Sequence, residues 1–240
     1  MVAMQKPIRA EQDDMRMKYS KISAVLLTAA ALTLSAACSD NKAYEMAICA
    51  LADTSGTYAS QRANVARIIK AGIVSQMQPG DSLFFITIDS NSYTKDNLID
   101  NLHLAYVPSQ ADAQRLAFAK VLDKFGRETA SSQYTDISGA MLLCSDYLNS
   151  TGAGKKAMLV FSDMQEDLPS GLHRKFDKNE FDGVNVAAMN VIQLKHDSAD
   201  PEEFKSRLKH WNERLKRAGA ASWKVLLDPV DIPEYLQKLR

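Results

Sequence analysis

Short, continuous apolar runs alternate along this chain with longer segments of helical periodicity. Such runs are typical of strands buried on both faces, as in a parallel sheet with helices packed on each side. The runs predict strands over residues 46–52, 83–88, 157–161, 184–192 and 223–227. The alternation therefore predicts an α/β fold with a Rossmann-like, doubly wound, mostly parallel central sheet covered by helices on both faces.

The segments between and after these strands predict helices. They cover residues 59–77, 111–125, 138–148, 201–218 and 231–239. The fourth helix has the clearest ends, because Asp200 offers an N-cap, Pro201 suits the first helical position and Gly219 stops the helix. One face carries an apolar stripe, formed by Phe204, Leu208, Trp211 and Leu215. The opposite face is basic, and we interpret it as a solvated surface.

The first 37 residues have the composition of a targeting segment. A short basic stretch, residues 17–21, precedes an apolar stretch over residues 22–34 that is too short to span a bilayer comfortably. Small residues follow and end at Cys38. This order is typical of a secretory signal peptide, with residues 1–16 as an upstream extension that takes no part in the fold.

The residues before Cys38 resemble a bacterial lipobox, although Ser35 stands where that motif usually has leucine. The resemblance implies cleavage before Cys38 and acylation of its thiol and amine. Ser39, rather than aspartate, follows the cysteine. The resemblance thus implies a lipid-anchored protein of the cell envelope, at the outer membrane and facing the periplasm.

Three regions follow from these patterns: a signal segment (1–37), a lipidated tether (38–43) and one α/β domain (44–240). The last region has about 200 residues, enough for a single well-packed core. Lys plus Arg and Asp plus Glu number 29 each, so no net charge favours nucleic acid as a partner. Cys49 and Cys144 are the remaining cysteines; an oxidising compartment would allow them to pair, but buried small hydrophobes are the commoner role.

A polar motif follows the first apolar run directly. It consists of Asp53, Thr54, Ser55, Gly56 and Thr57. The carboxyl ends of strands are where open α/β sheets place their ligand crevice. A carboxylate and hydroxyls gathered there suit a hard divalent cation such as Mg²⁺, although Ser55 or Thr57 could simply cap the next helix.

Two later segments have similar character. Thr135 and Asp136 precede a predicted helix, and Ser162 and Asp163 end a predicted strand. Taken with Asp-x-Ser-x-Thr at 53–57, this order resembles the von Willebrand factor type A domain and its metal-ion-dependent adhesion site. The resemblance covers the chain from about residue 44 to the end, with matching ligand positions at Asp53, Ser55, Thr57, Thr135 and Asp163.

The resemblance implies how those residues act. Ser55 and Thr57 would bind Mg²⁺ (or Mn²⁺ or Ca²⁺) directly, Thr135 directly or through water, and Asp53 and Asp163 partly through water. An acidic residue of a partner protein would complete the metal shell. Two departures from the resembled family bear on the loop geometry. Gln133 and Tyr134 stand where the family often has Gly-Gly before the threonine, and Met164 stands where it often has glycine after the last aspartate.

The expected function is a non-enzymatic binding module: an envelope lipoprotein that docks a protein partner through a bound cation. One alternative is a phosphatase like those of the haloacid dehalogenase superfamily, with Asp53 as nucleophile. Ser55 stands where that superfamily has its second aspartate, which removes the general acid. The other alternative is a type A scaffold whose altered loops bind no metal.

Overall fold

The computed structural model describes residues 41–189 and 201–240. Residues 42–240 belong to one compact unit. The predicted signal segment and Cys38 lie outside the described residues, as do Asp200 and the end of the strand expected over 184–192. Among the described helices, none is long and apolar enough to cross a membrane.

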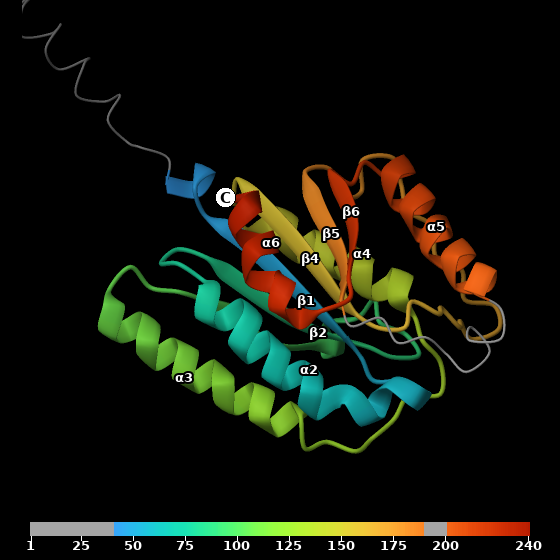
Figure 1. Cartoon of the computed structure of the whole chain (residues 1–240), viewed down its shortest axis with the longest axis horizontal. Coiled ribbons are helices and arrows are strands. Elements are labelled where there is room, and N and C mark those ends of the chain that lie inside the picture. The colour runs from blue at the N-terminus through green and yellow to red at the C-terminus, as the bar shows by residue number, and fades with distance from the viewer. Residues whose placement is uncertain (1–40, 190–200) are drawn as a thin grey trace, which may run out of the picture. The chain divides into compact units, whose positions relative to one another are not determined.

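A six-stranded sheet forms the centre of this unit (Figure 1). Its strands are β1 (Met46–Asp53), β2 (Ser82–Ile88), β3 (Leu98–His103), β4 (Lys155–Phe161), β5 (Val184–Met189) and β6 (Ser222–Leu226). Their order is β3-β2-β1-β4-β5-β6, and every neighbouring pair is parallel except β2 with β3. The order turns in both directions from β1, which is the doubly wound arrangement expected from the sequence.

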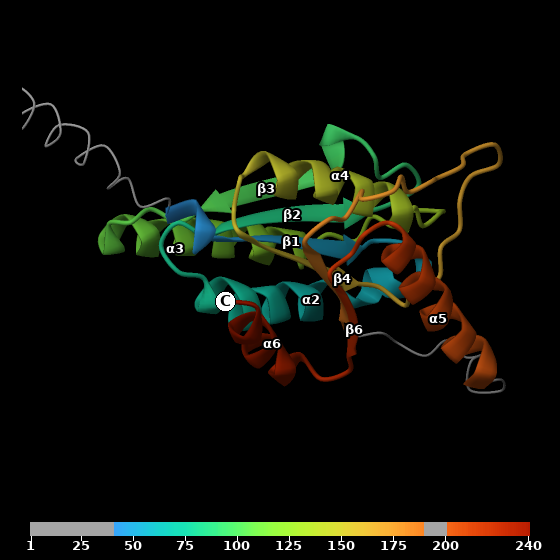
Figure 2. The same ribbon diagram turned by 90° about the horizontal axis from the view of Figure 1, so that it is seen from above.

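Helices cover both faces of the sheet, and Figure 2 shows α2 and α4 on opposite sides of it. The α-helices are α2 (Arg62–Ile68), α3 (Pro108–Phe125), α4 (Ile137–Ser150), α5 (Pro201–Arg217) and α6 (Ile232–Leu239). Short 3₁₀ segments are η2 (Asn41–Ala43), η3 (Gly56–Gln61), η5 (Val74–Gln76), η6 (Lys95–Asn97) and η7 (Pro229–Asp231), and η4 (Ile69–Ile73) is a π-helical turn. The helix expected over 59–77 is thus a succession of 3₁₀, α-helical, π-helical and 3₁₀ segments, η3, α2, η4 and η5.

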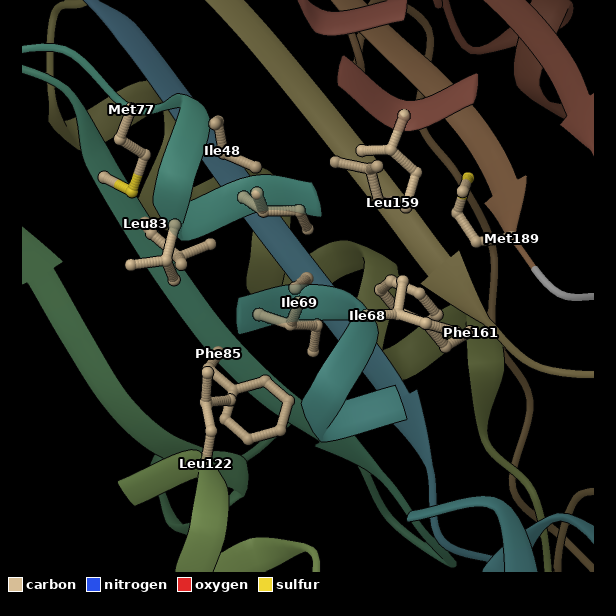
Figure 3. Close-up of a cluster of buried hydrophobic side chains, with 14 of the residues drawn as sticks. Ile48, Ile68, Ile69, Met77, Leu83, Phe85, Leu122, Leu159, Phe161 and Met189 are labelled. Atoms are coloured by element: carbon tan, nitrogen blue, oxygen red, sulfur yellow. The ribbon is translucent and has the colours of Figure 1, made fainter. Parts of the chain in front are cut away.

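Successive side chains of β1 point to opposite faces of the sheet, so helices must pack on both faces to bury them. All eight of its residues are buried. Ile48 and Ala50 face one core with Ile69, Phe85 and residues of α3 and α6, and Figure 3 shows part of this cluster. Ala47, Cys49 and Leu51 face a second core with residues of α4 and α5. The fold class expected from the sequence, a doubly wound, mostly parallel sheet with helices on both faces, is confirmed.

The antiparallel edge strand β3 was not expected from the sequence. Of its six residues only Leu102 is buried, and Asp100 and Asn101 interrupt the apolar character of the strand. The strand therefore lacks the continuous apolar run that marks the parallel strands. The strand expected over 223–227 is β6, which ends the sheet on the other side.

Cys49 and Cys144 are buried, free thiols. Cys49 lies on β1 and Cys144 on α4, within the same core. Burial is the main cause that raises the pKa of the Cys144 thiol, and a hydrogen bond with Cys49 raises it further. The thiol therefore stays protonated. Both residues act as small hydrophobes in this structure, which is the commoner of the two expected roles.

Candidate metal centre

Parallel pairing of β1 with β4 brings two of the predicted site segments together. Ala52 lies opposite Phe161 in the register, so Asp53 and Ser162 follow at the same carboxyl edge of the sheet. Asp53 is 2% exposed, and Asp163, one residue further along, is 7% exposed. The sheet order alone therefore places two buried carboxylates beside each other.

Hydroxyl and amide donors surround the Asp53 carboxylate. Ser55 donates to Oδ1 from its backbone N, at 2.8 Å, and from its Oγ, at 2.6 Å. Ser162 donates from its Oγ to Oδ2 at 2.7 Å. The side chain is thus fixed by hydroxyls whose own oxygen lone pairs stay available to a cation.

Burial raises the pKa of the Asp53 carboxyl to about 6, because the charged form loses its hydration. The hydrogen bonds from Ser55 and Ser162 act in the opposite direction, and the nearby Asp163 charge raises the pKa further. A buried carboxylate with a second one beside it is an environment in which a cation would be favourable. No other charge is needed to explain the direction of the shift.

Helix capping was the competing explanation for Ser55, and its side chain does not take that role. Ser55 occupies the N-cap position of η3 but makes no capping hydrogen bond from its side chain. The hydroxyl bonds to Asp53 instead. Thr57 lies in η3, and its side chain is outside the described part of the structure.

The loop before α4 runs alongside the first motif. Ser132 forms a parallel bridge with Ser55, and its N donates to the Thr54 carbonyl oxygen at 3.1 Å. Further along, Thr135 exchanges two backbone hydrogen bonds with Asp167, of 2.7 and 3.0 Å. Thr135 is 7% exposed. Backbone pairing therefore joins the three segments that the sequence singled out, those of Asp53, Thr135 and Asp163.

Asp136 is a structural residue that caps a helix and pairs with a buried arginine. Its Oδ1 accepts from the Gly139 N at 2.7 Å and caps α4. Its Oδ2 accepts from the Ser92 N at 2.9 Å and pairs with Arg174 Nη2 at 2.6 Å. The carboxylate is fully buried, so the guanidinium compensates its charge.

Arg174 comes from the loop over residues 168–183, between β4 and β5. Besides Asp136 it contacts Asn91, to whose Oδ1 it donates at 2.7 Å, and its guanidinium lies 5.8 Å from the ring centre of Tyr93. Phe176 and Phe181 pack edge to face within the same loop. The loop is therefore tied to the predicted site face, and no local pattern in the sequence identifies Arg174.

Met164 adopts a backbone conformation that favours glycine. Its φ is +62°, a left-handed conformation that side chains disfavour. The methionine is fully buried, its N donates to Ser162 Oγ at 3.0 Å, and its carbonyl oxygen accepts from Trp211 Nε1 at 2.8 Å. The departure from glycine therefore keeps the backbone turn and adds a core side chain.

The basic face of α5 is solvated only in part. Arg214 pairs with Glu166 at 3.2 Å, donates to Ser138 Oγ at 2.8 Å and stacks between Phe176 and Trp211. Glu166 in turn accepts from the Ser138 N at 2.6 Å. The expectation of a fully solvated face is wrong at Arg214, which links α5 to the start of α4.

The chemistry of the donor set fits a hard cation held largely by hydroxyls and water. Asp53, Asp163, Ser55 and Thr135 offer oxygen only. Within the described residues, no three His, Cys, Asp or Glu side chains cluster in a way that could hold a metal.

Comparisons with known proteins give structural likeness only. No protein-family model matches, and no curated protein matches. A mutant of the PilB minor pilin from Streptococcus sanguinis aligns at TM-score 0.46 and 10% identity, over 81% of this chain and 60% of that one. The conserved hypothetical protein BatB from Bacteroides thetaiotaomicron aligns at TM-score 0.46 and 14% identity, over 81% and 98%.

A von Willebrand factor type A structure from Catenulispora acidiphila aligns at TM-score 0.41 and 9% identity, over 81% of this chain and 41% of that one. These likenesses are remote. The fold class is established by the chain's own sheet order and helix layers.

Proposed function

We propose that this chain is a cell-envelope lipoprotein whose type A-like domain binds a divalent cation and docks a protein partner through it. The carrying observation is the Asp53 carboxylate, buried at the carboxyl edge of the sheet, bonded to the Ser55 and Ser162 hydroxyls and adjacent to Asp163. The proposed ligand set is Asp53, Ser55, Thr57, Thr135 and Asp163, and the proposed ion is Mg²⁺, with Mn²⁺ or Ca²⁺ as alternatives.

The protein's own groups hold the proposed site in place. Ser55 and Ser162 orient Asp53, and Arg174 and Gly139 fix Asp136 so that the loop carrying Thr135 is held in place. A cation bound there would supply an electrophilic centre for an oxygen ligand from outside the chain. Few direct carboxylates leave such an ion short of negative charge, so a partner's Asp or Glu is the fitting ligand.

Partner capture tests the docking step. The lipoprotein, solubilised from its membrane, is used as bait with Mg²⁺, with a chelator, and as the Asp163→Ala variant. Asp112→Ala, which removes an exposed carboxylate on α3, is the matched control. We expect a partner that is captured by the wild type and by Asp112→Ala and is lost with the chelator and with Asp163→Ala. A partner that is captured equally well in chelator and by Asp163→Ala would refute metal-mediated docking.

A further inference from the structure

Three exposed side chains with large apolar parts lie near the edge of the sheet at which β1 begins. Tyr44 is 81% exposed, Tyr106 56% and Val107 49%. Tyr44 comes two residues before β1, and Tyr106 and Val107 lie between the antiparallel strand β3 and α3. Because β3 runs opposite to β1, its end and the start of β1 share one edge of the sheet.

Direct contacts hold Lys42, Glu45 and Tyr106 together at this edge. The Tyr106 hydroxyl donates to Glu45, the neighbour of Tyr44. Lys42 pairs with the same Glu45 carboxylate at 2.9 Å. The Lys42 carbonyl oxygen accepts from Gly154 N at 2.7 Å, just before β4. We name the surface formed by Lys42, Tyr44, Tyr106 and Val107 the amino-edge face.

The tether to this face is very short. Only Ser39, Asp40 and Asn41 separate Cys38 from Lys42. Four residue steps span no more than about 14 Å even when fully extended. If Cys38 carries lipid, as the proposed function requires, the amino-edge face cannot leave the vicinity of the bilayer surface.

We propose that the amino-edge face rests in the headgroup layer of the membrane that holds the lipid anchor. This inference depends on the anchoring part of the proposed function and not on its metal site. Tyrosine rings with an apolar body and a polar hydroxyl suit that layer.

The orientation of the candidate metal centre follows from this placement. β1 runs from the amino-edge face to Asp53, and its eight residues rise about 25 Å at the usual spacing of a strand. Figure 1 shows the chain end also at the amino edge, where Arg240 Nη1 lies 3.3 Å from Asp81 Oδ1. The metal centre therefore points away from the bilayer, towards the compartment in which a partner would approach.

Depth-dependent quenching tests the orientation on the full lipoprotein in vesicles of phosphatidylethanolamine and phosphatidylglycerol that contain nitroxide lipids. A polarity-sensitive dye is attached to Tyr44→Cys, Val107→Cys or Leu227→Cys. Leu227 is the matched control, because it is 69% exposed and follows β6 at the opposite, carboxyl edge. Cys49 and Cys144 are buried, and the unsubstituted protein measures any labelling of them.

We expect strong quenching at positions 44 and 107 and quenching several-fold weaker at 227. Equal quenching at all three, or stronger quenching at 227, would overturn the proposal. Mass spectrometry of the same samples detects acyl chains on Cys38, and their absence would overturn it too. Metal titration of these samples reports on the candidate metal centre separately, so the two proposals can fail independently.

Discussion

At position 164 a methionine occupies a left-handed backbone conformation, with φ of +62° and a fully buried side chain. At ordinary φ values a glycine variant is less stable than an alanine variant, because glycine loses more backbone entropy on folding. Here we expect the reverse. Met164→Gly should be more stable than Met164→Ala by about 1 kcal/mol, since only alanine retains the left-handed penalty.

Urea denaturation of both variants measures this difference. Each should be less stable than the wild type, because both lose the buried methionine side chain, at a cost of about 2–5 kcal/mol. An alanine variant as stable as the glycine variant, or more so, would show that position 164 is not under conformational strain.

Asp53 makes stability depend on pH. Its folded-state pKa of about 6 is higher than the reference value of 3.8, so folding favours the protonated form. The stabilisation by protonated Asp53 is therefore complete below about pH 4 and is lost as the pH rises through 6. Without metal, Asp53→Asn should gain stability over the wild type between pH 5 and 7.5, by about 1–3 kcal/mol.

Denaturation of both proteins in chelator, at pH 5 and 7.5, measures this pH dependence. A stability difference that is the same at both pH values would contradict a raised pKa. The affinity for a cation should instead increase with pH. Asp53 binds a cation as the carboxylate, so the affinity falls as that group is protonated below pH 6.

At the scale of elements, the start of α4 depends on one buried carboxylate. Asp136 caps the helix and compensates the charge of Arg174, whose side chain is 13% exposed. Asp136→Ala should cost about 3–5 kcal/mol, because it leaves the guanidinium buried without its partner. Asp136→Asn keeps a capping oxygen and the size of the side chain and should cost clearly less.

Thermal unfolding of the two Asp136 variants and of Arg174→Met measures these costs. The double variant Asp136→Asn with Arg174→Met should recover part of the loss, because it leaves no buried charge unpaired. Additive losses in the double variant would show that the two side chains are not coupled.

The same elements show what the sequence could and could not predict. The parallel strands were predictable because 46–52 and 157–161 are continuous apolar runs, and a parallel sheet then brings Asp53 and Asp163 to one edge. Strand β3 was not, because Asp100 and Asn101 interrupt its apolar character. The Arg174–Asp136 pair joins residues 38 positions apart, and no local periodicity encodes such a contact.

At the scale of the whole molecule, a cation that binds only the folded domain should stabilise it. At a free concentration 100 times the dissociation constant the gain is about 2.7 kcal/mol, which corresponds to a rise in Tm of about 5–10 °C for a domain of this size. Differential scanning fluorimetry with Mg²⁺, Mn²⁺ and Ca²⁺ measures that rise. A wild-type Tm that none of the three ions changes would instead support the metal-free scaffold.

The presence of a cation centre at the carboxyl edge of the sheet is tested most directly by titration calorimetry. The domain is titrated with Mg²⁺ and Mn²⁺ as wild type, Asp53→Ala, Asp163→Ala and the exposed control Asp112→Ala. We expect one ion per chain for the wild type and the control and no binding for the other two. Absence of binding by the wild type, or equal binding by all four proteins, would contradict the assignment of the centre to Asp53 and Asp163.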